Sequence, residues 1–143
     1  MNQSTAYAAY RSAEVETISQ RDLIVRLYQG AEKFLVAGRT AMSDKKNEEA
    51  TNQCRRAREI FVELLSTLNF DAGGDVAQQL RDLYVFLIYQ ISEASLKKNP
   101  TQIDALIPII KTMREGWEAV PDEHANLTSI PEGNQGHSLN MRC

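Results

Sequence analysis

The sequence has little of what holds small secreted, metal-binding or membrane proteins together. Two cysteines occur among 143 residues, Cys54 and Cys143, and their spacing fits neither a disulfide framework nor a zinc site. The longest apolar run, Leu83 to Tyr89, has seven residues, whereas a membrane-spanning helix needs about 20. The first residues show no basic segment leading into an apolar one. We therefore expect a cytoplasmic protein with no secretion signal, no membrane insertion, and no metal or other cofactor.

Histidine is also scarce, and both histidines, His124 and His137, follow the region of helical periodicity. That region therefore lacks the usual base of a serine or cysteine nucleophile. It also lacks the Glu-x-x-His pairs of di-iron helical bundles. Gly73-Gly74 is an isolated pair, and no glycine-rich phosphate loop occurs. These absences argue against an enzyme, and we expect no catalytic residues.

Neither sign of charge dominates, since 16 Lys and Arg against 19 Asp and Glu give a net charge of -3. The densest basic cluster is Arg55, Arg56 and Arg58, and Glu59 and Glu63 follow it in the same helical pattern. Binding to nucleic acid needs a clustered basic face, so we expect no nucleic-acid partner. Arg58 lies furthest from the apolar stripe of its segment, and we expect it to be solvated.

What the sequence does contain is apolar residues at helical spacing, without the alternation that is typical of strands. Ser19 and Asp22 have the form of a capping box, which predicts a first helix over 19–43. The same periodicity predicts further helices over 46–69, 75–98 and 101–120, the last two opened by capping boxes at Asp75 and Thr101. Pro108 is expected to kink the last helix or to break its first turn.

Four amphipathic helices with short connections predict an all-α fold, an antiparallel four-helix bundle. From Pro121 onward the chain is rich in Pro, Gly, Asn and Ser and has no apolar periodicity. We therefore expect one helical-bundle domain over 1–120, in which 1–18 form a short N-terminal segment, and a disordered tail over 121–143.

Two of the expected helices are more apolar than one core contact requires. The apolar set of the first spans an arc of roughly 160°, whereas one core-facing stripe needs roughly 100°. In the third, Leu80 and Leu87 define the core side, which leaves Val85, Phe86 and Tyr89 pointing away from it. Such a helix is covered either by its own chain or by another molecule.

Two interpretations of this surplus remain open. Either the N-terminal residues pack over the third helix, or a groove there accepts an amphipathic helix from a partner. The two are compatible, because a weakly held N-terminal segment can occupy a site that a partner later takes. A permanent homo-oligomer interface, such as a homodimer, is the alternative from a different class of function.

Four single residues inside the expected helices are predicted to serve helix packing or the core. Gly30 and Gly38, spaced i and i+8 on one side of the first helix, indicate close approach of a neighbouring helix or of a ligand helix. Cys54 lies at the centre of an apolar stripe and is expected to be a buried, inert thiol. Trp117 is expected to be a core residue, with contact to a partner as the alternative.

The order of particular residues over positions 6–120 identifies a resemblance to a known family. They are, in sequence, Ala6-Tyr7, Tyr10, Val15-x-Thr17, Ser19, Leu23-Ile24-x-x-Leu27-Tyr28-x-Gly30-Ala31, Phe34, Ala57-x-x-Ile60, Glu63-Leu64, Leu68-Asn69, Leu80-x-x-Leu83-Tyr84 and Trp117. This order resembles the flagellar secretion chaperone FliS family. Two positions depart from the family pattern: Gln20 stands where a proline often follows the capping serine, and Val85-Phe86 stand where an Asp-Tyr pair is frequent.

The resemblance implies a cytoplasmic four-helix bundle with a short N-terminal helix. It implies binding of the C-terminal segment of new flagellin, protection from premature polymerisation, and delivery to a component of the flagellar export gate, with a flagellar regulatory protein as a possible further partner. It implies that Tyr7 and Tyr10 cap the hydrophobic surface and that Tyr28 and Tyr84 belong to the groove. With the residues on the wide stripes, the expected partner-binding set is Tyr7, Tyr10, Ile24, Tyr28, Leu80, Tyr84, Phe86 and Tyr89.

Overall fold

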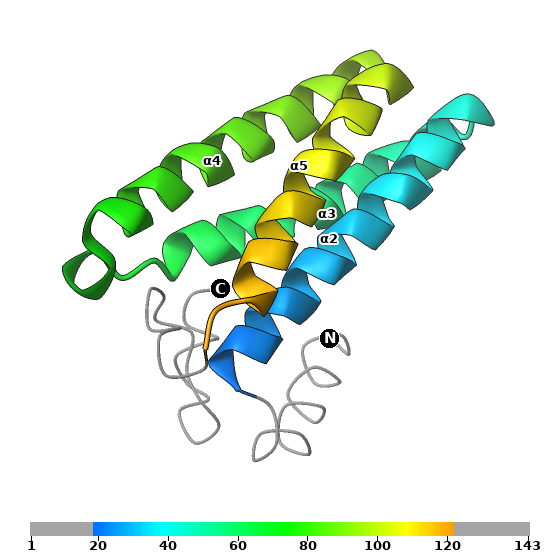
Figure 1. The fold of residues 1–143 in the computed structure, drawn as a ribbon. Coiled ribbons are helices and arrows are strands. Elements are labelled where there is room, and N and C mark those ends of the chain that lie inside the picture. The colour runs from blue at the N-terminus through cyan, green and yellow to red at the C-terminus, as the bar shows by residue number, and fades with distance from the viewer. Residues whose placement is uncertain (1–18, 122–143) are drawn as a thin grey trace, which may run out of the picture.

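The computed structural model describes residues 19–121, which form four helices and contain no β-strand. The helices are α2 (Gln20–Ser43), α3 (Asn47–Ser66), α4 (Phe70–Lys97) and α5 (Pro100–Glu118). Consecutive helices run in opposite directions (Figure 1). The predicted all-α four-helix bundle is therefore confirmed. The expected N-terminal helix lies outside the described residues, as does the expected tail apart from Pro121.

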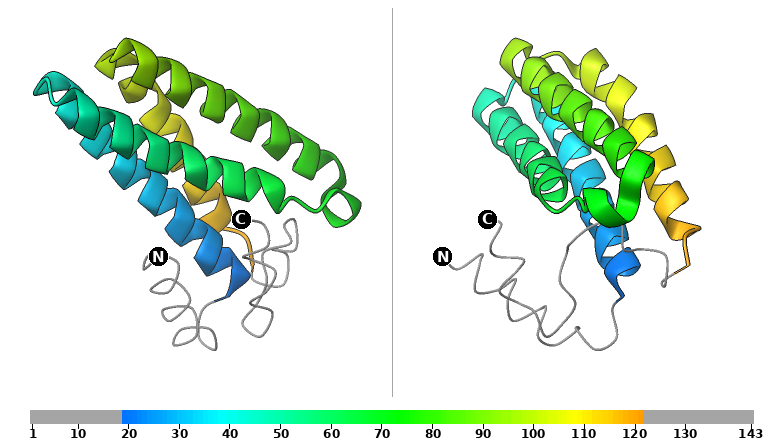
Figure 2. Two further views of the ribbon diagram at one scale, coloured as in Figure 1. Left: turned by 180° about the vertical axis from the view of Figure 1, so that it is seen from behind. Right: turned by 90° about the vertical axis from the view of Figure 1, so that its left-hand side faces the viewer.

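The four helices do not pack equally. Helix α2 lies between α3 and α5, and α4 packs on α3. Among the four neighbouring helix pairs, α4 and α5 have the smallest contact, because they are joined at Lys98 and Asn99 and diverge toward their other ends (Figures 1 and 2). The bundle is therefore closed along three helix contacts and open along most of the fourth.

Side-chain caps define where three helices begin. The Ser19 hydroxyl accepts the backbone N–H of Asp22 at 3.1 Å, so the predicted first cap is confirmed. The caps expected at Asp75 and Thr101 are wrong: Asn69 caps α4 and Asn99 caps α5. Asparagine is as good an N-cap as aspartate.

Gly74 and Pro108 affect their helices differently. The residues before Gly74 form one helical turn of α4, and Gly74 follows with φ of 53° and ψ of -128°, which interrupts the helix internally. Helix α5 continues through Pro108, so the expected broken first turn is wrong. Pro108 is exposed, and the carbonyl that its missing N–H leaves without a helical partner can be hydrated there.

Helices α2 and α3 approach closely at the two glycines of α2. A Cβ atom added at Gly38 would lie 3.0 Å from Cys54 Sγ, and one at Gly30 would lie 3.5 Å from Ile60 Cδ1. Close approach of a neighbouring helix is thus confirmed at Gly38, whereas at Gly30 a Cβ atom would make only an ordinary van der Waals contact. Cys54 is buried, as expected, and burial raises the pKa of its thiol.

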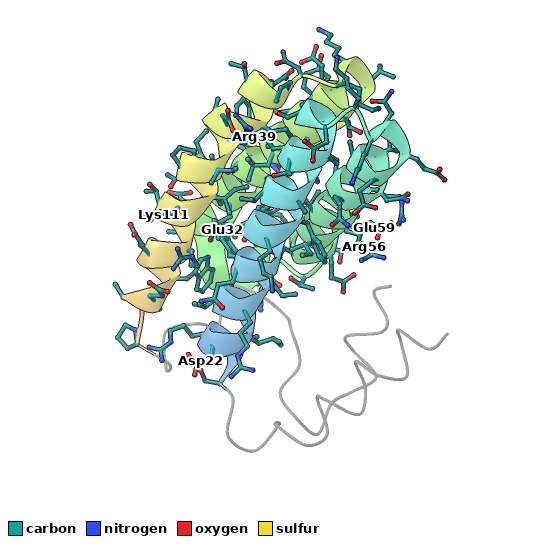
Figure 3. All side chains as sticks on the ribbon, turned by 90° about the vertical axis from the view of Figure 1, so that its right-hand side faces the viewer. Asp22, Glu32, Arg39, Arg56, Glu59 and Lys111 are labelled. Carbon is teal, nitrogen blue, oxygen red and sulfur yellow. The ribbon has the colours of Figure 1, made fainter. Side chains whose placement is uncertain are left out.

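Ion pairs support the contact between α2 and α5. Arg114 Nε donates to Glu32 Oε2 at 2.6 Å, and Arg39 Nε donates to Asp104 Oδ1 at 2.8 Å. Glu32 and Arg39 lie along the same side of α2 (Figure 3). The side chains of Arg114 and Glu32 are each only 18% exposed, whereas those of Arg39 and Asp104 are each more than 40% exposed. The Glu32 pair is therefore the less screened of the two.

Candidate functional site

The expected partner-binding residues fall into three groups in the structure. Tyr7 and Tyr10 lie outside the described residues. Leu80 is half-buried, and Phe86 and Tyr89 are exposed on α4, pointing away from the core as predicted. The remaining three, Ile24, Tyr28 and Tyr84, are fully buried.

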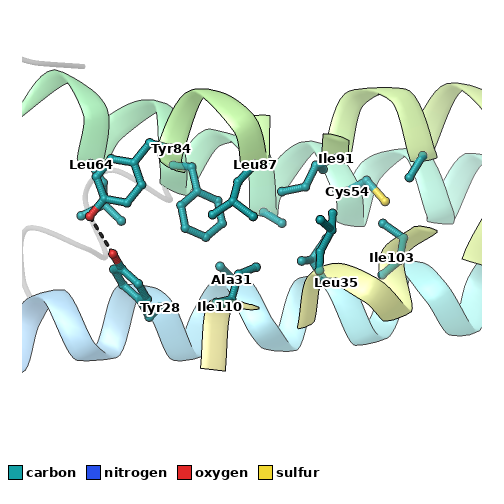
Figure 4. Close-up of a cluster of buried hydrophobic side chains, with 14 of the residues drawn as sticks. Tyr28, Ala31, Leu35, Cys54, Leu64, Tyr84, Leu87, Ile91, Ile103 and Ile110 are labelled. Carbon is teal, nitrogen blue, oxygen red and sulfur yellow. Dashed lines mark hydrogen bonds between the residues drawn. The ribbon is translucent and has the colours of Figure 1, made fainter. Parts of the chain in front are cut away.

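The burial of Tyr28 and Tyr84 corrects their expected position on an open groove. Their hydroxyl oxygens lie 2.7 Å apart across the core (Figure 4), and Trp117 Nε1 donates to the Tyr28 oxygen at 3.3 Å. A tyrosine can be wholly buried when its hydroxyl finds a partner inside. Ile24 has no polar group and is buried as an ordinary core residue. Contact of these three with a partner would therefore require the helices to move.

Each of the four helices contributes one aromatic ring to this part of the core. The Phe61 ring of α3 lies 6.0 Å from Tyr28, edge to face, and 6.0 Å from Tyr84. Burial raises the pKa of Tyr28 to about 12 and raises that of Tyr84 well above its ordinary value. Both phenols are thus neutral and act as hydrogen-bonding groups within the cluster. Trp117 of α5 is 5% exposed, which confirms its prediction as a core residue.

Exposed apolar side chains gather on one helix. Of the nine large apolar residues that are exposed between residues 19 and 121, seven belong to α4. They are Phe70, Val76, Leu83, Val85, Phe86, Tyr89 and Leu96. A concentration of this kind on a single element is typical of an interaction surface, because single apolar residues elsewhere on a surface are normal.

The side of α4 that faces α5 is fixed by the hydrogen bonds of Gln102, one of which goes to Glu93 Oε1 at 3.0 Å. Gln102 Nε2 of α5 donates to Gln90 Oε1 of α4 at 2.8 Å. Residues seven apart lie nearly in line on a helix, so Leu83 and Val76 share the side of Gln90. Both side chains are exposed there because α5 has diverged from α4 at this level.

On α5, the same reasoning places two half-buried residues opposite this side of α4. Ile109 lies seven residues after Gln102, and Met113 lies one further turn along. We call the surface formed by Val76, Leu80, Leu83, Ile109 and Met113 the α4–α5 seam. It is an apolar strip between two diverging helices, with Phe86 and Tyr89 exposed on the outer side of α4 beside it.

The described part of the chain contains neither a cluster of metal ligands nor a helix that could span a membrane. No group of three His, Cys, Asp or Glu side chains within residues 19–121 is arranged to hold a metal ion. None of the four helices is long and apolar enough to cross a membrane. The arrangement suits binding of an apolar or amphipathic chain.

Comparison with known proteins identifies the family that this chain is similar to. A family model described as flagellar protein FliS matches residues 1–124. Flagellar secretion chaperone FliS of Vibrio cholerae is 31% identical over 129 residues, which cover 87% of this chain and 95% of that protein. The chaperone of the same name from Campylobacter jejuni is 33% identical over 128 residues, covering 90% and 98%. The one from Salmonella typhimurium is 24% identical over 125 residues, covering 84% and 93%.

Proposed function

Because this chain belongs to the FliS family of flagellar secretion chaperones, we propose that it acts in the cytoplasm as an export chaperone for flagellin. In this proposal it binds the C-terminal segment of flagellin, prevents premature polymerisation and assists delivery to the export gate. No catalytic step is involved. The observation that carries the proposal is the concentration of exposed apolar side chains on α4.

The proposed client site consists of the α4–α5 seam together with Phe86 and Tyr89. A Phe side chain contributes about 1.5–3 kcal/mol when it is fully buried, and Phe86 is 43% exposed in the free protein. Several such side chains together supply the free energy that a disordered segment needs to become ordered on binding, which is about 2–5 kcal/mol or more. A strip between diverging helices can accept an amphipathic helix of the client, whose apolar face then rests on the strip.

Ile24, Tyr28 and Tyr84 support this site from below. They belong to the core cluster against which Leu80 packs, so they hold the seam in shape while Leu80, Leu83 and Phe86 contact the client. Their part in binding is therefore indirect in this proposal. Tyr7 and Tyr10 belong to the segment that covers part of the apolar surface until flagellin displaces them, which lowers the apparent affinity by the fraction of molecules that are covered.

Substitution of the exposed residues tests the client site. Phe86→Asp and Tyr89→Asp introduce a charge on the outer side of α4 and should weaken binding of a flagellin C-terminal peptide by about tenfold or more, because a charge replaces a desolvated aromatic contact. Val36→Asp is the matched control, because Val36 is 49% exposed and lies on α2. Titration calorimetry of the peptide into each folded variant measures the effect. Equal affinities of all variants would overturn the proposed site.

Light scattering separates this function from permanent homo-oligomerisation. A chaperone should change from the free chain to a defined complex when the flagellin peptide is added. A stable oligomer, such as a homodimer, that is indifferent to the peptide would favour the alternative. Removal of residues 1–12 adds a kinetic test: we expect faster association, because the site is uncovered, and weaker equilibrium binding, because two tyrosines that also contact the client are lost.

A further inference from the structure

A second surface of α4, on the side of α3, has a different character from the α4–α5 seam. Arg58 Nη1 of α3 donates to Ser92 Oγ of α4 at 3.5 Å, which fixes the sides of the two helices that face each other. Arg58 is half-buried here, so the expectation that it is a solvated residue was wrong. The physical reason is that α4 packs on this side of α3, outside the apolar stripe from which the expectation was made.

The two helices contribute matching rows of residues to this surface. Counting from the contact between Arg58 and Ser92, each row repeats at spacings of four, three and four, which keeps its members in line along a helix. We call the surface between the rows the α3–α4 groove. Its rows are Thr51, Arg55, Arg58 and Val62 on α3, and Val85, Tyr89, Ser92 and Leu96 on α4.

The walls of this groove are apolar at several points. Val62 is 47% exposed, Val85 is 50% exposed and Leu96 is 82% exposed. Between the rows lies a hollow of about 240 Å³, whose lining includes Cys54 and Ile91 from the core. A hollow of this size is below the roughly 300–1,000 Å³ of small-molecule sites. It therefore suits one or two side chains from a docking chain.

The charged residues that line the hollow are all cationic. Three cationic residues, Arg55, Arg58 and Lys98, line the hollow, and no acidic residue does. Arg55 is offset by an ion pair with Glu59 at 3.2 Å. Among the described residues, Arg58 donates to Ser92 alone, and the Lys98 ammonium donates to the Ser95 carbonyl at 2.8 Å. Within residues 19–121, neither Arg58 nor Lys98 has a carboxylate partner.

We propose that the α3–α4 groove is a docking site for an acidic amphipathic helix of a protein partner, adjacent to the flagellin site, with which it shares Tyr89 but not Arg58 or Lys98. The apolar side of that helix rests on Val62, Val85 and Leu96, and its carboxylates reach Arg58 and Lys98. A half-buried guanidinium without an anion is an incomplete ion pair that such a partner completes. A helix that repeats its apolar residues at spacings of four and three fits between the two rows.

The first test uses a synthetic helical peptide with leucines at spacings of four and three flanked by glutamates. A second peptide has the same leucines flanked by lysines. The full chain should bind the acidic peptide, should bind the basic one at least about tenfold more weakly, and should lose affinity for the acidic one as salt is added. Amide NMR shifts at Thr51, Ser92 and Ser95 locate the binding. Equal binding of the two peptides, or shifts confined to the α4–α5 seam, would overturn the proposal.

Charge reversal at Arg58 makes the test specific. Arg58→Glu should reverse the preference between the two peptides, an effect that misfolding cannot produce. Arg58→Gln should weaken binding of the acidic peptide without reversing the preference. Arg56→Glu is the matched control, since Arg56 projects from the same helix with its guanidinium 5.7 Å from the Phe34 ring of α2 (Figure 3). It should leave the preference unchanged.

Two further outcomes separate this proposal from its alternatives. Arg58→Glu should leave binding of the flagellin peptide intact, so that failure of the groove and failure of the flagellin site are observed independently. If light scattering shows that the wild-type chain self-associates and that Arg58→Glu abolishes this association, a second copy occupies the groove and the proposal of an acidic partner is wrong.

Discussion

The hydroxyl oxygens of Tyr28 and Tyr84 lie 2.7 Å apart, although the two residues are 56 positions apart in the chain. The indole N–H of Trp117 donates to the same Tyr28 oxygen. Tyr28 therefore joins α2 to both α4 and α5, and Trp117 also interacts with the Tyr84 hydroxyl. Between α4 and α5, the neighbouring pair with the smallest contact, this shared oxygen is an indirect connection.

Removal of the Tyr28 hydroxyl should cost more stability than removal of the Tyr84 hydroxyl. Tyr28→Phe loses two hydrogen bonds and leaves the Trp117 N–H without that acceptor, whereas Tyr84→Phe retains the bond from Trp117. An unsatisfied buried donor costs about 1–3 kcal/mol, so we expect a loss of about 2 kcal/mol for Tyr28→Phe and about 1 kcal/mol for Tyr84→Phe. Urea unfolding followed by circular dichroism measures both. Equal losses would show that Tyr28 is not the shared partner.

The same two tyrosines predict how stability depends on alkaline pH. Burial favours the neutral phenol in the folded state and raises the pKa of Tyr28 to about 12, while an unfolded tyrosine ionises near pH 10. The stabilisation is therefore fully present below about pH 10 and is lost as pH rises toward about 12. The free energy of unfolding of the wild type should fall over this range more steeply than that of the Tyr28→Phe/Tyr84→Phe variant. Parallel profiles would contradict the burial of these phenols.

The sequence predicted those features of the fold that depend on local periodicity. The four helices, the Ser19 cap and the exposure of Phe86 and Tyr89 all follow from spacing within a single segment. The caps at Asn69 and Asn99 were missed because several residues near each boundary can cap a helix, and local pattern alone does not choose between them.

The parts of the site that depend on contacts between distant segments were not predictable in this way. A tyrosine on a wide apolar stripe can face a groove or the core, and the choice depends on whether another residue meets its hydroxyl. For Tyr28 that residue is Tyr84. Arg58 was similarly misplaced, because Ser92, which it meets, comes from a helix whose packing position the sequence pattern does not give.

Gly116 and Gly74 form a matched pair of glycines, because a Cβ atom at either would meet no atom within 4 Å. Gly116 lies in α5 with an ordinary helical backbone, so Gly116→Ala should stabilise the protein by about 0.5–1 kcal/mol. Gly74 has φ of 53°, which disfavours any residue with a side chain, so Gly74→Ala should destabilise by about 1 kcal/mol. Thermal unfolding of the two variants measures the contrast. A gain in stability at Gly74 would mean that the break in α4 is not needed.

Gly30 and Gly38 allow the closeness of the contact between α2 and α3 to be measured. Alanine is favoured over glycine in a helix by about 0.8–1 kcal/mol. At Gly30 the new Cβ would meet only the end of the Ile60 side chain at 3.5 Å, so Gly30→Ala should stabilise by about 0.5 kcal/mol or more. At Gly38 it would meet Cys54 Sγ at 3.0 Å, with Gln53 Cβ and the Ala50 carbonyl close behind. We therefore expect Gly38→Ala to destabilise by about 1 kcal/mol.

A double-mutant cycle with Cys54 identifies the origin of that loss. Cys54→Ala removes the buried sulfur and leaves a small cavity, so alone it should destabilise the protein. In the Gly38→Ala/Cys54→Ala protein the new methyl group occupies part of the space that the sulfur left, so the combined loss should be smaller than the sum of the single losses by about 1 kcal/mol. Urea unfolding of the four proteins gives this coupling energy. Additive losses would mean that the helices separate to admit the methyl group and that the sulfur does not set their distance.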